Sequence, residues 1–140
     1  MLFGKRERTV KRILIVEDEP LVAFDNEHSL REAGYEIVAT VDTVPNAIKA
    51  MDDDVHLILA DVNLSDGGSG QDVARAAQSL GVPLIFVTGG SPPDARALAV
   101  GVLSKPYSQR DLIAAIDSVD AKLSGRVPKR IPKTFTLFTD

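Results

Sequence analysis

Three carboxylates stand together near the start of the chain, directly after a run of aliphatic residues. The stretch ILIVEDEP ends its apolar run with Glu17, Asp18 and a further glutamate. Neighbouring carboxylates repel one another and resist burial, so such a group is either solvated or balanced by a cation. Asp61 ends a second aliphatic run, and Lys105 follows a third. These residue types predict a charged site that holds a divalent metal ion, with the lysine as a second, permanent cation.

The elements that must position these groups alternate between strand and helix. Short aliphatic runs, of the kind buried on both faces of a parallel sheet, occur at 13–16, 37–41, 55–60, 83–87 and 102–103. Helical stretches are expected at 20–33, 45–51, 71–80, weakly at 93–99, and from the capping residue Ser108 onward. This alternation predicts an α/β fold: a doubly wound five-stranded parallel sheet flanked by five helices.

In such a sheet, ligands collect at the carboxyl ends of the strands. The polar residues at those ends are, in strand order, Glu17 with Asp18, Asp61, Thr88 and Lys105. Carboxylate oxygens and water make the octahedral shell that Mg²⁺ prefers. Asp61 is the expected nucleophile for phosphoryl transfer. The hydroxyl of Thr88 and the ammonium of Lys105 are expected to stabilise the phosphoryl oxygens.

This set of residues resembles the receiver domain of two-component response regulators, with a likeness that covers residues 12 to about 124. The residues that carry it are Glu17-Asp18, Asp61, Thr88 followed by Gly89, and Lys105-Pro106. The resemblance implies a flavodoxin-like receiver fold with Mg²⁺ as its cofactor. It implies that Asp18, Asp61 and the main-chain carbonyl of Asn63 bind the metal. Glu17 would bind through water or replace an aspartate, and the Lys105-Pro106 bond would be cis.

The resemblance implies a phosphoacceptor rather than an enzyme. A sensor histidine kinase or a histidine phosphotransfer protein would donate the phosphoryl group to Asp61, and the domain would catalyse its own phosphorylation and slow dephosphorylation. Output would pass by contact with a downstream protein, or the chain would act as a phosphoryl shuttle or sink. Two alternatives stay open: a pseudo-receiver that binds partners without phosphorylation, and a small Mg²⁺-dependent phosphohydrolase that uses an aspartyl phosphate.

The chain departs from the usual receiver pattern in the region of its switch. Most receivers carry an aromatic residue three positions before the lysine, where this chain has Val102, and its tyrosine, Tyr107, follows the Lys-Pro pair instead. The segment between Thr88 and Lys105 is short and rich in glycine and proline, so we expect a short fourth helix. These features look like a variant receiver subclass of alpha-proteobacterial stress signalling.

Length and charge set the remaining expectations. The 140 residues include no cysteine and no apolar run long enough to span a membrane, so we expect a cytoplasmic protein without a membrane partner. Residues 13–123 carry a net charge of −11, whereas the two ends together carry +7. Nucleic acid is not an expected partner, because binding it requires a basic face on the folded domain.

The chain divides into three expected parts: a basic N-terminal arm at 1–11, the receiver domain at 12–124 and a C-terminal tail at 125–140. The basic ends are expected to be solvated arms. We expect no output domain after the receiver, so protein contact is the expected output. Phe135 and Phe138 make the tail a candidate interaction element. They would pack on their own domain or on a neighbouring chain, which leaves a homodimer open.

Overall fold

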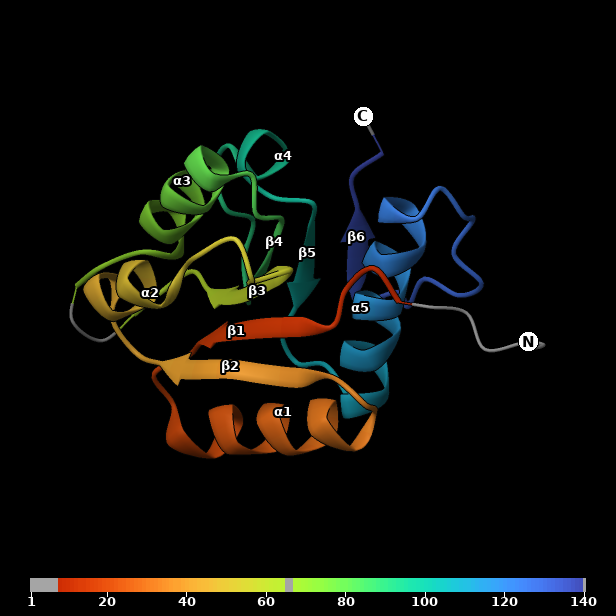
Figure 1. Ribbon diagram of the computed structural model, residues 1–140, viewed down its shortest axis with the longest axis horizontal. Coiled ribbons are helices and arrows are strands. Elements are labelled where there is room, and N and C mark those ends of the chain that lie inside the picture. Colours follow the sequence, from red (N-terminus) through yellow and green to blue (C-terminus); the bar gives the residue numbers. More distant parts are fainter. Residues whose placement is uncertain (1–7, 65–66, 140) are drawn as a thin grey trace.

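Strands from the whole chain join in one sheet, with the order β2-β1-β3-β4-β5-β6 (Figure 1). The computed structural model describes residues 8–64 and 67–139, and within them the strands are β1 (Arg12–Val16), β2 (Glu36–Val41), β3 (Leu57–Asp61), β4 (Leu84–Thr88), β5 (Gly101–Ser104) and β6 (Phe135–Leu137). The first five are parallel, and β6 runs antiparallel to β5. Most of the expected N-terminal arm, residues 1–7, lies outside the described residues.

The helices follow the expected order along the chain. In the described residues they are α1 (Pro20–Glu32), α2 (Val44–Ala50), α3 (Gly70–Leu80), α4 (Ala95–Leu98) and α5 (Gln109–Leu123). The Ser108 hydroxyl caps α5 by accepting a hydrogen bond from Asp111 N at 3.0 Å, as the sequence predicts. The short fourth helix is confirmed, since α4 has only 4 residues. Among the described helices, none is both long and apolar enough to cross a bilayer.

The parallel strands are buried on both faces because successive residues join opposite hydrophobic clusters. Ile13 and Ile15 of β1 pack in the cluster that includes residues of α1 and α5. Leu14 and Val16 pack in the cluster that includes residues of α2 and α3. Figure 1 shows α2 and α3 on one side of the sheet and α1 on the other. The doubly wound α/β fold is therefore confirmed.

The tail adds a strand that the sequence analysis missed. Strand β6 pairs with β5, with Phe135 opposite Leu103 and Leu137 opposite Gly101. Phe135 is 4% exposed and Phe138 is 9% exposed, so the tail packs on its own domain. A strand of three residues has no periodicity that distinguishes it from a loop. The predicted sheet was therefore one strand short.

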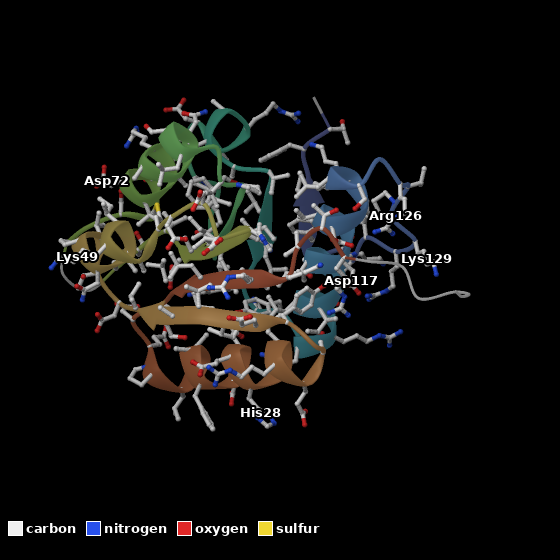
Figure 2. The ribbon with its side chains drawn as sticks, viewed as in Figure 1. His28, Lys49, Asp72, Asp117, Arg126 and Lys129 are labelled. Atoms are coloured by element: carbon white, nitrogen blue, oxygen red, sulfur yellow. The ribbon has the colours of Figure 1, made fainter. Side chains whose placement is uncertain are left out.

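The described parts of the two basic ends are attached to the domain and are not free arms, although Lys11, Lys129 and Lys133 are exposed to solvent as expected. The backbone N–H groups of Thr9 and Val10 donate to Asp120 Oδ1 at 2.6 and 2.8 Å. Arg126 pairs with the other oxygen of the same carboxylate at 2.8 Å. Figure 2 shows Arg126 beside α5, in the loop that follows this helix. Asp120 thus joins both ends of the chain to the domain.

Candidate functional site

Carboxylates from two adjacent strands converge at the carboxyl edge of the sheet. Glu17 and Asp18 follow β1, and Asp61 is the last residue of β3, which pairs with β1. Carboxylate oxygens of all three lie within 4.8 Å of one another. Glu17 and Asp61 are each only 5% exposed, and Asp18 is half-buried. We call Glu17, Asp18 and Asp61 the acidic cluster, and the structure brings them together as the sequence predicts.

Lys105 reaches into the acidic cluster from the end of β5. Its Nζ lies 2.9 Å from Asp61 Oδ2, while the other oxygen of Asp61 accepts a hydrogen bond from Asn63 N at 3.1 Å. Burial alone lowers the pKa of Lys105, but its bond to Asp61 and the nearby carboxylates outweigh burial and raise the pKa. The lysine is therefore a permanent cation at neutral pH. The Lys105-Pro106 peptide bond is cis, which confirms the expectation from the resemblance.

One lysine does not balance three carboxylates. Burial, helped by the charge of Asp61, raises the pKa of Glu17 to about 7, although Glu19 N donates to Glu17 at 3.1 Å and Lys105 is nearby. Ionising every carboxylate in this space is costly without a further cation. Close-set carboxylate oxygens are the hard donors that Mg²⁺ prefers. The donor set and its excess negative charge thus fit a magnesium ion.

Thr88 ends β4 beside the acidic cluster and is 5% exposed. Its Oγ1 accepts a hydrogen bond from Gly90 N at 3.1 Å, and its main-chain oxygen accepts one from Lys105 N at 2.8 Å. The threonine therefore joins the ends of β4 and β5. A hydroxyl that accepts one bond still has its own proton to donate. Thr88 can therefore donate to a ligand at this edge.

Gly70 supports the site, although the sequence analysis did not single it out. This first residue of α3 donates its N–H to Val62 O at 2.8 Å, directly after Asp61. A Cβ on Gly70 would lie 2.5 Å from the main-chain oxygen of Asp61, which is closer than real contacts allow. Only glycine lets the helix start so near the end of β3. A glycine in a Gly-rich loop indicates ordinary turn chemistry, so no sequence pattern points to this contact.

A buried polar network also lies behind the site and was missed. The Asn26 side chain of α1, only 2% exposed, donates to Tyr107 Oη at 2.9 Å and accepts from Gln109 Nε2 at 3.1 Å. Burial raises the pKa of Tyr107, although the bond from Asn26 opposes the shift. Tyr107 lies two residues after Lys105, so this network fixes the backbone just beyond the lysine. Nothing in the sequence indicates that these three side chains meet.

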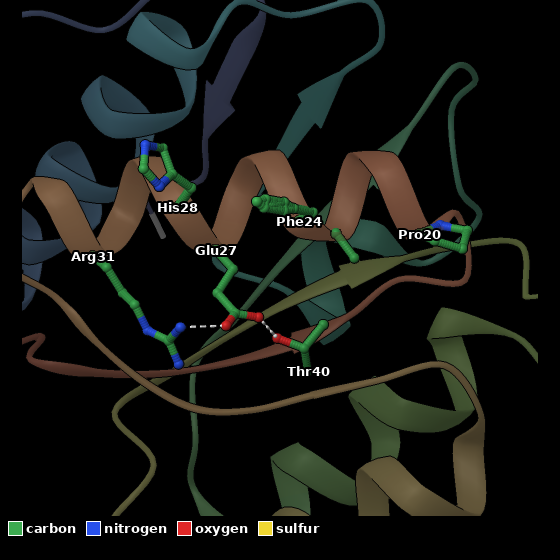
Figure 3. A pocket seen from close by; sticks show the side chains of 7 residues that line it. Pro20, Phe24, Glu27, His28, Arg31 and Thr40 are labelled. Atoms are coloured by element: carbon green, nitrogen blue, oxygen red, sulfur yellow. Dashed lines mark hydrogen bonds and ion pairs between the residues drawn. The ribbon is translucent and has the colours of Figure 1, made fainter.

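A separate hollow of about 380 Å³ lies along α1 beside β2 (Figure 3). There Glu27 accepts a hydrogen bond from Thr40 at 2.7 Å and forms an ion pair with Arg31. The hollow is lined by Pro20, Ala23, Phe24, Glu27, His28, Arg31 and Thr40. This lining includes no residue of the acidic cluster, and its one carboxylate is already paired. The hollow therefore adds no group to the candidate site.

The similarity of the sequence to known protein families supports the same kind of site as the geometry does. A family model of the response regulator receiver domain matches residues 13–117. The chain belongs to this family. The family prediction made from the strand-end residues is thus confirmed.

Two curated proteins and one solved structure illustrate the likeness to this family. The phyllosphere-induced regulator PhyR of Methylorubrum extorquens is 33% identical over 74% of this chain and 41% of its own length. PdtaR of Mycobacterium tuberculosis is 34% identical over 76% of this chain and 55% of its own length. The solution structure of SdrG from Sphingomonas melonis has 35% identity and a TM-score of 0.65, covering 79% of this chain and 96% of that one. The chain thus spans about half the length of these two curated relatives.

Proposed function

We propose that this receiver domain accepts a phosphoryl group on Asp61 from a phosphohistidine of a sensor histidine kinase or phosphotransfer protein. The observation that carries the proposal is the position of the Asp61 carboxylate. One of its oxygens is held by Lys105 Nζ at 2.9 Å and the other by Asn63 N at 3.1 Å, beside two further acids. A carboxylate fixed at both oxygens loses little freedom when it attacks phosphorus.

In the proposed step, an oxygen of Asp61 bonds to phosphorus while the phosphorus–nitrogen bond of the donor breaks, and the electron pair returns to the imidazole. Lys105 and Thr88 donate to the phosphoryl oxygens, where negative charge is spread in the transition state. The acidic cluster and the main-chain carbonyl of Asn63 would hold Mg²⁺. When bound, this ion neutralises part of the charge on the phosphoryl oxygens.

The domain is proposed to act as a phosphoacceptor whose output is protein contact, or as a phosphoryl shuttle or sink. A protein partner is supported by the relatives. A solved structure with 28% identity and a TM-score of 0.60 is described as the anti-anti-sigma factor PhyR from Bartonella quintana, of which this chain covers 45%. An anti-anti-sigma factor acts on another protein, so a protein partner is the class of output that this likeness favours.

The test is incubation with Mg²⁺ and acetyl phosphate, read by intact mass, with Asp61→Asn as the matched control. We expect the wild type to gain the mass of one phosphoryl group and the variant to gain none. The substitution keeps the shape of the side chain but removes the nucleophile. A wild type without the adduct would favour a pseudo-receiver. Turnover of p-nitrophenyl phosphate that requires Asp61 would favour a phosphohydrolase.

A further inference from the structure

The outer edge of β5 is covered by a segment of the same chain. Strand β6 pairs antiparallel with β5, and main-chain hydrogen bonds continue past both of its ends. Ser104 N donates to Thr134 O at 2.8 Å, and Phe138 N donates to Val100 O at 2.9 Å. Figure 1 shows β6 next to α5. Residues 134–138 thus occupy the edge of β5 as an added strand does in β-augmentation.

The edge has a slot for one aromatic ring. A Cβ on Gly101 would lie 2.5 Å from Phe135 Cζ and 2.6 Å from Thr136 O, so the ring and the backbone of β6 use the space that glycine leaves. Phe135 is 4% exposed and packs in the same cluster as Leu103 and Leu112. Glycine inside a strand marks such a close approach. The slot is therefore specific for a strand that brings a flat ring to this position.

A second aromatic contact lies three residues further along the tail. The guanidinium of Arg96 in α4 stacks over the Phe138 ring at 4.8 Å, and Lys122 of α5 donates to the main-chain oxygen of Phe138. The exposed side chain of Thr136 lies between the two aromatic residues. The tail thus contacts this edge through two rings three positions apart, with main-chain bonds between them.

The tail reaches this edge through a connection without regular structure. Residues 124–134 join α5 to β6 and form neither helix nor strand. This connection is itself held to α5, because Thr134 donates to Asp111 at 2.9 Å and Ser118 donates to Arg130 O at 3.0 Å. The tail therefore competes at an effective concentration of at least about millimolar, and a free competitor must bind the edge more tightly or find the tail loosened. An edge strand released from its neighbour presents unpaired N–H and C=O groups that favour pairing with another chain.

We propose that the edge of β5 is a binding site for an extended segment of a partner protein that carries two aromatic residues three positions apart. The tail fills this site in cis, and the partner segment replaces it. The partner's main chain bonds to Val100 and Ser104, its first ring enters the slot at Gly101, and its second ring stacks on Arg96. This inference needs neither Mg²⁺ nor phosphorylation, and its failure would leave the proposed phosphoacceptor role untouched.

The test uses full-length variants and a fluorescent peptide with the sequence of residues 131–139, followed by anisotropy. Phe135→Ala loosens the resident strand and should bind the peptide at least about tenfold more tightly than the wild type, because competition in cis is weaker. Thr136→Ala, a matched change at an exposed position, should bind as the wild type does. Gly101→Ala should expel the tail and also exclude the peptide, so it should show no binding.

Two results would overturn the proposal: Phe135→Ala binding no better than the wild type, or Gly101→Ala binding as well as Phe135→Ala. Circular dichroism checks that each variant is folded. If Phe135→Ala does not fold, Phe138→Ala takes its place, since it removes only the terminal ring contact, and the same tenfold gain is required of it. A peptide with alanine at both aromatic positions should not bind any variant, and its binding would contradict the specificity for aromatic rings.

Discussion

Among the residues that the structure describes, buried carboxylates occur at two places, and their surroundings differ. Asp120 in α5 is 5% exposed, and it accepts from two backbone N–H groups at 2.6 and 2.8 Å and from Arg126 at 2.8 Å. Glu17 and Asp61 are equally buried, but they lie close to each other and to Asp18, with one lysine that pairs with Asp61. The chain supplies the donors for Asp120. It leaves the acidic cluster short of positive charge.

This difference separates a structural acid from a functional one. Taking the partner from a buried charge destabilises the fold, so a buried charge with its donors in place is structural, while like charges that share a site raise the pKa of one of them and cost stability. Such local conflicts are expected where a protein binds a ligand. Asp120 therefore explains how the chain ends are attached, and the acidic cluster is the feature on which the proposed binding of a cation rests.

The largest expected effect is on stability at Asp120. Asp120→Ala leaves the N–H groups of Thr9 and Val10 and the guanidinium of Arg126 without their shared acceptor, so it should lower the free energy of unfolding by about 2 to 3 kcal/mol. Urea denaturation measures this change. Asp25→Ala, at an exposed position on α1, is the control and should stay within about 0.5 kcal/mol. Equal effects of the two substitutions would contradict the structural role of Asp120.

The Gly70→Ala substitution should lower both the stability of the fold and the phosphorylation of Asp61. The added Cβ must push the start of α3 away from Asp61 and Val62, which we expect to cost about 1 to 2 kcal/mol of unfolding free energy. Because Asp61 moves with its backbone, the yield of phosphorylated protein after acetyl phosphate should fall as well. Gly89→Ala is the matched control for the free energy of unfolding, since a Cβ there meets no atom within 4 Å. Full phosphorylation of a folded Gly70→Ala protein would contradict this support of Asp61.

The Glu17→Gln substitution tests the excess negative charge of the acidic cluster through the pH dependence of stability. Burial raises the pKa of Glu17 from its usual value of 4.5 to about 7, so the folded state favours the protonated form. The resulting stability is fully present below pH 4.5 and is lost as the pH rises through 7. In Mg²⁺-free buffer the variant should therefore be more stable than the wild type at pH 8, by about 1 kcal/mol. The difference should shrink toward zero at pH 4.5. A stability difference between the variant and the wild type that does not change with pH would contradict the raised pKa of Glu17.

The smallest expected effect is on the lifetime of the phosphorylated form. Asn63 is exposed directly beside Asp61, where a water must approach phosphorus in line for hydrolysis. Asn63→Met places an apolar group there and should lengthen the lifetime severalfold, less than the tenfold that about 1.4 kcal/mol would give. Decay of the phosphorylated mass over time measures this, with Asn46→Met on the exposed face of α2 as control. A shorter lifetime would contradict the proposed approach of water.

The sequence predicted the sheet and the acidic cluster for the same reason. Buried parallel strands are continuous aliphatic runs, and a polar residue that ends such a run must lie at the ligand-binding edge. Asp61 and Lys105 were found this way. Contacts between distant segments leave no such pattern. Strand β6 is too short for periodicity, and neither the donors to Asp120 nor the close approach at Gly70 depends on neighbours in sequence.

The most direct test of the account is the free energy of unfolding of the wild type as a function of Mg²⁺ concentration at pH 8. If the acidic cluster lacks a cation, stability should rise with the logarithm of Mg²⁺ once its concentration exceeds the Kd, because the ion binds only the folded state. Asp18→Asn, which removes one carboxylate charge, should shift this rise to higher concentration by about tenfold, or about 1.4 kcal/mol of binding free energy. A wild type whose stability does not respond to Mg²⁺, or a variant that responds identically, would contradict the account.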